Sequence, residues 1–199
     1  MLAHFRPTLV LLALFTALTG LAYPLAVTGI AAVLFPAQAG GSLVSRHGEI
    51  VGSTLIGQNF TSARYFHARP SATSAPDPKD ASKTLDAPYN AANSSGSNLG
   101  PTSKALIARI RADVAAKRQA GWTGALPADA LTTSASGLDP DISPANALLQ
   151  APAVAHARGL DAAIVRALAL AHVERPQFGF FGEPRVNVLL LNLALDALK

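Results

Sequence analysis

The pattern of hydrophobic and polar positions divides the chain into a long apolar N-terminal segment and a mixed remainder. No Asp, Glu, Lys or Arg occurs from Pro7 to Ser45, and Leu9 to Phe35 is almost entirely Leu, Ala, Val, Ile and Phe. As a helix, these roughly 27 residues would be about 40 Å long, more than the roughly 30 Å of bilayer hydrocarbon. The pattern therefore predicts a single transmembrane helix at about residues 9–35, which anchors one soluble domain.

Two other interpretations of the apolar segment remain open, a cleaved signal peptide and a buried core helix. Ala37-Gln38-Ala39 has the spacing of a signal-peptidase site, but the apolar cores of signal peptides are only about 7–15 residues long. A core helix of this length would be unusual. His4 and Arg6 are the only cationic side chains before the segment, which favours an N-terminus in the cytoplasm. We therefore expect an N-terminal region with the anchor at residues 1–39 and a soluble extracytoplasmic domain at 40–199.

The soluble part has strand patterns first and helix patterns later. Apolar residues on both sides of a turn at Arg46–Glu49 predict a hairpin over residues 42–58, and Arg64–His67 is a short aromatic strand candidate. Capping residues, prolines and apolar periodicity predict helices in four segments: 103–118, 143–159 with an interruption at Pro152, 161 to near 176, and from Pro184 towards the C-terminus. This order predicts an α+β domain.

Two helices carry patterns that predict which side faces the core. In the first, Leu106, Ile110 and Val114 recur every fourth residue, which predicts a buried face. In the last, leucines predict the apolar side, and Asn187, Asn192 and Asp196 predict the polar side.

Residues 68–102 are dominated by Pro, Ser, Asp, Asn and Gly. A polar stretch of this length exceeds ordinary loop lengths, so we expect a functional excursion or a partly mobile segment. Its last part leads into a helix N-terminus, where backbone N–H groups could hold an anion. The weak candidates for cofactor binding are Ser95, Gly96, Ser97, Asn98 and Gly100. The phosphate-loop motif itself is missing, which favours a structural turn built by these residues.

Composition and spacing argue against several other functions. The formal net charge is +4, but no block of Lys or Arg suggests a nucleic-acid surface. The chain has no cysteine, and its five histidines lack metal-ligand spacing. Asp139 and Asp141 are not followed by the Gly and Glu of a calcium loop. We therefore expect no metal site, no catalytic residues and no enzyme in its own right.

Several long strings resemble the C subunit of the Kdp potassium-transporting P-type ATPase, and together they cover essentially the whole chain. They are Tyr23–Ala39 with Gly41–Leu43, Tyr65–Ser71, Tyr89–Thr102, Thr133–Pro140, Gly182–Asn187 and Leu191–Asp196.

The resemblance implies a non-catalytic, single-span subunit of an ATP-driven potassium uptake complex in the cell (inner) membrane. Its implied partners are a channel-like, potassium-binding subunit and an ATP-hydrolysing subunit, besides the lipid bilayer. The family is described as a catalytic chaperone that raises the ATP affinity of the ATPase subunit, or as a cap over the potassium entrance. Because a domain outside the cell cannot reach cytoplasmic ATP, we favour assembly and stabilisation. No tightly bound cofactor is expected, and ATP would act through the complex only.

For contact with a partner helix, the sequence favours Gly20 and Gly29 in the span, because small residues allow helices to approach closely. The alternative is a span that faces lipid. Two other functions remain open. One is a stand-alone membrane-anchored periplasmic binding domain whose Ser/Asn/Gly loop captures a small anion. The other is a hydrolase that uses a serine from residues 94–97 or 134–136.

Overall fold

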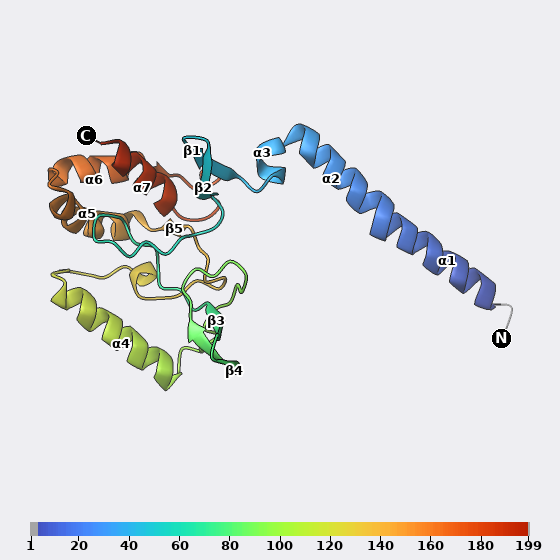
Figure 1. Ribbon diagram of the computed structural model, residues 1–199, viewed down its shortest axis with the longest axis horizontal. Helices are drawn as coiled ribbons and strands as arrows, with labels where there is room; N and C mark the ends of the chain where they lie inside the picture. The colour runs from blue at the N-terminus through green and yellow to red at the C-terminus, as the bar shows by residue number, and fades with distance from the viewer. Residues whose placement is uncertain (1–3, 199) are drawn as a thin grey trace. The chain divides into compact units, whose positions relative to one another are not determined.

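The structure is a computed structural model that describes residues 4–198 (Figure 1). The chain forms two compact units, Met1–Val51 and Gly52–Lys199. Each unit is described by itself.

The first unit contains one long apolar helix, Phe5–Leu34, of 30 residues. Its most apolar stretch has a mean hydropathy of 2.0, and by length and composition the helix could cross a membrane. It consists of α1 (Phe5–Ala17), a π-helical turn η2 (Leu18–Ala22) and α2 (Tyr23–Leu34). Pro24 explains the wider turn, because its ring displaces the carbonyl four residues earlier and it has no N–H to donate. The predicted helix is confirmed.

After the short helix α3 (Pro36–Ala39), strands β1 (Leu43–Arg46) and β2 (Glu49–Ser53) form the predicted hairpin. His47 and Gly48 form its turn with φ angles of 54° and 85°. Two successive residues with positive φ match the twist of a tight hairpin, and glycine adopts this conformation without a steric penalty.

Within its described residues, the second unit combines two small antiparallel sheets with four helices, which confirms the α+β prediction. The first sheet pairs β3 with β4, and the second has the order β5-β7-β6. In chain order the elements are β3 (Ser74–Asp77), β4 (Asp80–Asp86), α4 (Lys104–Gln119), the 3₁₀ turn η3 (Ala128–Ala130), β5 (Asp141–Ile142), α5 (Pro144–Arg158), α6 (Ala162–Ala171), β6 (Val173–Glu174), β7 (Arg185–Asn187) and α7 (Val188–Ala197).

Helices α5, α6 and α7 lie together and enclose the core, while α4 lies apart from them (Figure 1). The three core helices begin at side-chain caps: Ser143 accepts from Asn146 N, Asp161 from Ala163 N, and Asn187 from Leu190 N. Such caps satisfy N–H groups that have no partner within the helix. The largest fully buried side chains of the core include Phe66, Ile142, Leu191, Leu195 and Val165.

Several predicted boundaries were wrong. Pro152 does not interrupt α5, because it lies on the exposed side, where water can hydrate the carbonyl that loses its helical N–H partner. Helix α6 ends at Ala171, well before Pro176, because the chain turns into β6. The last helix starts only at Val188, since β7 occupies the residues after Pro184. Residues 68–102 contain the β3–β4 hairpin, which the sequence did not predict.

Two predicted faces also differ from the structure. Leu106, Ile110 and Val114 on α4 are only half-buried, because α4 lies apart from the other helices. On the supposed polar side of α7, Asn187 and Asn192 are both buried. Their amides have hydrogen-bond partners inside the unit, which makes their burial tolerable.

Candidate functional site

The predicted cofactor-binding loop packs along the segment 133–137. Ser95 N donates to Ser136 O at 3.0 Å, and Ser95 Oγ donates to Ala72 O at 3.2 Å. A Cβ on Gly96 would lie 2.7 Å from Ala135 O, so only glycine permits this approach. Ser97 Oγ lies 3.4 Å from Thr133 Oγ1. Asn98 and Gly100 are exposed just before α4. The loop therefore has a structural role, and anion binding by it stays a prediction.

Gly20 and Gly29, the predicted partner-contact residues, lie in the long apolar helix of the first unit. A Cβ built on either residue would meet no atom within 4 Å. Both positions thus present an open backbone surface that a second helix could approach closely. Their role in partner contact stays a prediction.

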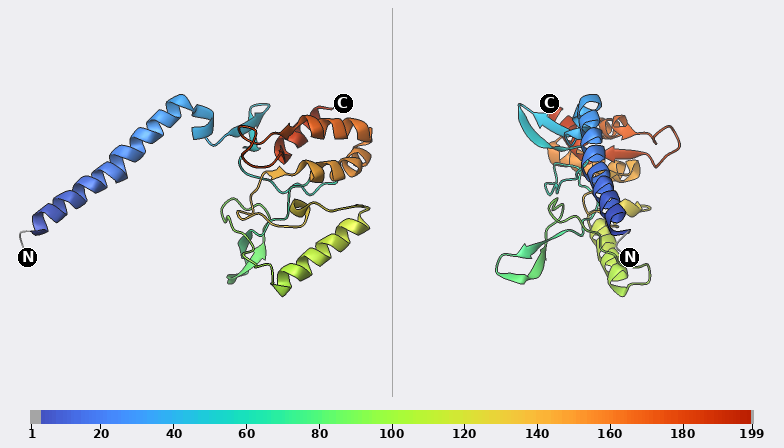
Figure 2. Two further views of the ribbon diagram at one scale, coloured as in Figure 1. Left: turned by 180° about the vertical axis from the view of Figure 1, so that it is seen from behind. Right: turned by 90° about the vertical axis from the view of Figure 1, so that its right-hand side faces the viewer.

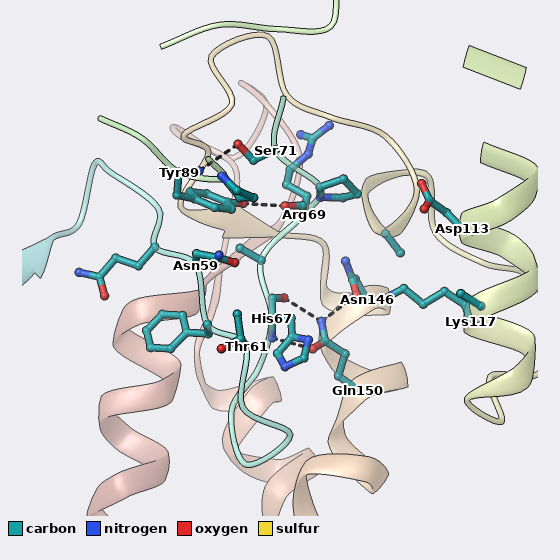
Figure 3. A pocket seen from close by; sticks show the side chains of 17 residues that line it. Asn59, Thr61, His67, Arg69, Ser71, Tyr89, Asp113, Lys117, Asn146 and Gln150 are labelled. Carbon is teal, nitrogen blue, oxygen red and sulfur yellow. Dashed lines mark hydrogen bonds between the residues drawn. The ribbon is translucent and has the colours of Figure 1, made fainter. Parts of the chain in front are cut away.

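A cavity of about 460 Å³ lies between α4 and the segments that carry residues 58–71 and 88–89 (Figure 3). Most of its lining residues have polar or charged side chains, and α5 contributes Asn146 and Gln150. The side chains that matter for the argument are His67, Arg69, Tyr89, Asp113, Lys117 and Gln150. None of these residues was predicted from the sequence to be a functional residue.

One wall of the cavity includes His67, and two side-chain amides hold the backbone of His67 and of the preceding Phe66. Asn192 on α7 accepts from Phe66 N at 2.8 Å and donates to Phe66 O at 2.9 Å. Gln150 on α5 accepts from His67 N at 2.8 Å and donates to His67 O at 2.9 Å. The strand predicted at Arg64–His67 is therefore wrong, because amide side chains take the place of a neighbouring strand.

The Gln150 amide continues into a polar network. Its Nε2 also donates to Asn146 Oδ1 at 3.0 Å, and Asn146 Nδ2 donates to Asp129 Oδ2 at 2.9 Å. The Asp129 carboxylate further accepts from Ser143 N and Ser143 Oγ, both at 2.8 Å. Each buried amide here has hydrogen-bond partners, which fixes the orientation of this wall.

Arg69 and Tyr89 hold a second wall. Arg69 Nη1 forms an ion pair with Asp139 Oδ2 at 2.8 Å, and its Nη2 donates to Thr133 O at 3.3 Å. The Tyr89 hydroxyl donates to Arg69 O at 2.7 Å. Burial raises the pKa of the Tyr89 phenol above its usual range, and the nearby Asp139 carboxylate adds to the effect. Tyr89 therefore stays a neutral donor.

Helix α4 supplies the opposite wall, with Asp113 and Lys117 (Figure 3). Arg109 Nη1 bridges Asp113 Oδ2 at 3.0 Å and Leu131 O at 3.1 Å. In the described part of the chain, Arg109 Nε and Nη2 are buried without a hydrogen-bond partner. Burial lowers the pKa of Lys117, whose Nζ lies 4.5 Å from the centre of the Trp122 ring. Polar and charged groups thus face the cavity, which suits a polar ligand.

Asp139 and Asp141, considered from the sequence as calcium ligands, both form ion pairs within the fold. Asp139 pairs with Arg69, and the Asp141 carboxylate lies 3.1 Å from Arg185 Nε. Burial raises the pKa of Asp141 above its usual value, and Arg185 partly offsets this effect. Within residues 4–198, no group of three or more His, Cys, Asp or Glu side chains could hold a metal ion.

We expect Tyr89→Phe to lower the free energy of unfolding by about 0.5–1.5 kcal/mol at pH 7, because the bond to Arg69 O is lost. Above the ordinary pKa of 10.0 this difference should shrink. The folded state holds the phenolic proton more tightly than the unfolded state, so its contribution is lost as the pH rises. Urea unfolding of both proteins from neutral pH to about pH 11 measures the effect. A difference that stays constant or grows above pH 10 contradicts the assignment.

Comparison with known proteins places the whole chain in one family. The model of the family "K+-transporting ATPase, c chain" matches residues 5–197. The chain is 62% identical over 198 residues to the potassium-transporting ATPase KdpC subunit of Methylobacterium nodulans, covering 100% of this chain and 98% of that protein. It is 60% identical over 199 residues to the KdpC subunit of Rhodopseudomonas palustris strain BisB18, covering 100% of both chains. The KdpC subunit of Bradyrhizobium diazoefficiens is 59% identical over 196 residues, 98% of each chain. The chain therefore belongs to the KdpC family, the c chains of potassium-transporting ATPases.

Proposed function

We propose that this chain is a non-catalytic accessory subunit that supports the assembly and stability of a potassium-transporting ATPase complex. The match to the c chain of such ATPases over residues 5–197 carries the proposal. The partners in this proposal are the channel-like, potassium-binding subunit and the ATP-hydrolysing subunit. The chain joins the complex through its apolar helix and its folded second unit.

The proposed location is the cell inner membrane, with one span and the second unit outside the cytoplasm. The helix Phe5–Leu34 supports a single span by its length and composition. His4 and Arg6 before it support an N-terminus in the cytoplasm, because cationic residues are retained on that side. In this orientation, the described family role of raising ATP affinity would act through the partner subunits. No cofactor is then bound by this chain itself.

Within the span, Gly20 and Gly29 are the proposed contact points for a partner helix. The open backbone surface at both positions supports this, since van der Waals packing drives helix association in lipid. Thr28 offers a matched control, because at about 100° per residue it lies about 100° around the helix from Gly29 and about 80° from Gly20.

We expect Gly29→Leu to reduce several-fold the amount of ATP-hydrolysing subunit that co-purifies with the tagged full chain from detergent-solubilised membranes. Thr28→Leu should leave co-purification near the unsubstituted level. The leucine at position 29 would hold the partner helix away, whereas the same side chain at position 28 lies between the faces of the two glycines. Potassium-dependent ATP hydrolysis of the purified material gives a second readout of assembly.

If the unsubstituted chain co-purifies with no ATPase subunit, the accessory-subunit proposal fails. The stand-alone anchored binding domain then becomes the better proposal, with the cavity beside α4 as its site. If both leucine variants reduce co-purification equally, the specific contact at Gly29 is wrong while the subunit role stands.

A further inference from the structure

The loop between β6 and β7 ends in a cluster of three phenylalanines, Phe178, Phe180 and Phe181. This loop projects away from the body of the second unit (Figure 2, right). Its end is closed by a pair of hydrogen bonds, both 2.9 Å long, in which Gln177 N donates to Phe181 O and Phe181 N donates to Gln177 O. The aromatic cluster therefore sits on a hydrogen-bonded hairpin tip.

The three rings contact one another but remain largely exposed. The ring centres of Phe180 and Phe181 are 4.2 Å apart, and those of Phe178 and Phe181 are 6.4 Å apart. The exposed fractions are 80% for Phe178, 71% for Phe180 and 59% for Phe181. A single exposed apolar residue needs no explanation, but three adjoining rings at a tip indicate a surface that is covered in the working protein.

The backbone conformation of this tip also indicates a function. Phe178 has a φ of 55° and Gly179 a φ of 84°. The left-handed conformation is uncommon for a bulky side chain such as phenylalanine, and it suits Gly or Asn better. An aromatic residue at this position is thus not explained by the needs of the turn. Such strain is a ground for inferring a function at the site.

The charges around the tip fit an apolar, neutral environment. No charged residue occurs from Gln177 to Gly182. At the base of the hairpin, Arg185 is paired with Glu174 at 2.9 Å and with Asp141 at 3.1 Å. This cation is thus already compensated within the fold. The tip lacks the free basic cluster that would draw it to an acidic surface.

We propose that Phe178, Phe180 and Phe181 insert into the interfacial layer of the bilayer that holds the chain's own apolar helix. The inference rests on the proposed single span. About 17 residues join Leu34 to the second unit, and because they include α3 and most of the β1–β2 hairpin, they reach less than the about 60 Å of a fully extended segment. Because the tether makes insertion intramolecular, a tip that would partition weakly by itself can stay bound. A small convex tip also suits a fluid layer, which needs no preformed pocket.

The absence of cysteine allows a direct test with single nitroxide labels. The full chain is reconstituted into phosphatidylcholine vesicles as three variants, Phe180→Cys, Leu85→Cys and Leu21→Cys. Leu85 is a matched control, an apolar side chain 50% exposed on the other hairpin of the same unit. Leu21 lies in the apolar helix and reports on the span itself. Power saturation compares collision with oxygen, which concentrates in lipid, and with a water-soluble nickel chelate.

We expect the Phe180 label to collide several-fold more with oxygen than with nickel, at a depth of about 5–10 Å. The Leu85 label should show the opposite preference. Replacing part of the phosphatidylcholine by anionic lipid should leave the Phe180 result unchanged, because the two cations beside the tip, Arg175 and Arg185, are balanced by Glu174 and Glu183.

The outcomes separate this inference from the span on which it rests. If the Leu21 label is in lipid but the Phe180 label is as accessible to nickel as the Leu85 label, insertion is wrong and the span stands. If the Phe180 label is shielded from both reagents, it lies in a contact between protein chains, which also overturns insertion. If the Leu21 label collides mainly with nickel, the span itself fails, and with it the proposed arrangement.

Discussion

Asn192→Ala is expected to lower the free energy of unfolding by about 2–6 kcal/mol. The substitution removes the amide that donates to Phe66 O and accepts from Phe66 N, at 2.9 Å and 2.8 Å. It leaves two buried backbone groups without partners, and each such group costs about 1–3 kcal/mol. Urea unfolding of the full-length protein in detergent, followed by resistance to a brief protease pulse, measures the change.

Asn93→Ala is the matched control for this prediction. Asn93 also donates its amide to a backbone carbonyl, Ser74 O at 3.0 Å, but it is exposed. Water can replace the lost bond there, so we expect a change below about 1 kcal/mol. Equal effects of the two substitutions would mean that the Phe66 backbone is not held by Asn192 in the way described.

Phe66→Ala is expected to lower the free energy of unfolding by about 3–5 kcal/mol. Phe66 is fully buried and packs in the core formed with α5, α6 and α7. Truncation removes the transfer free energy of the ring and leaves a cavity that the surrounding helices can only partly fill. The same unfolding measurement applies, with the urea midpoint as the readout.

Phe178→Ala provides the comparison, because this side chain is 80% exposed at the β6–β7 tip. We expect a change of less than about 1 kcal/mol, as for most exposed positions. If Phe66→Ala changes the free energy of unfolding as little as Phe178→Ala does, the segment that contains Phe66 is not part of the core. Because Phe66 is also the residue that Asn192 holds, the double variant should lose less than the sum of the two single effects.

The segment Phe66-His67 shows where prediction from the sequence reached its limit. Its aromatic pattern predicts a short strand, but no strand forms. The amides that bind its backbone come from residues 83 and 126 positions later in the chain. A sequence signal for them does exist. Asn146 and Gln150 are four residues apart on one face of an Ala- and Leu-rich helix, and Asn192 lies within a leucine run. Isolated amides on apolar faces indicate buried hydrogen bonds.

The cavity likewise could not be predicted from the sequence. It forms because α4, an independently predicted helix, lies apart from the core helices, with Asp113 and Lys117 on its side facing the gap. The periodicity of Leu106, Ile110 and Val114 predicts that α4 has an inner face. It gives no information on how closely that face approaches the rest of the unit, because the distance depends on loops at both ends of the helix.

The sequence by itself determined the apolar helix, the α+β class, the caps of α4, α5 and α6, and the family. Each of these depends on residues that are close together in the chain: a charge-free run, a side-chain oxygen two or three residues before a backbone N–H, or a contiguous motif. The tertiary structure alone decided the partners of Phe66 and His67, the cavity beside α4 and the exposed phenylalanine tip. These features arise where distant segments meet or fail to meet, and local periodicity carries no information about such distances.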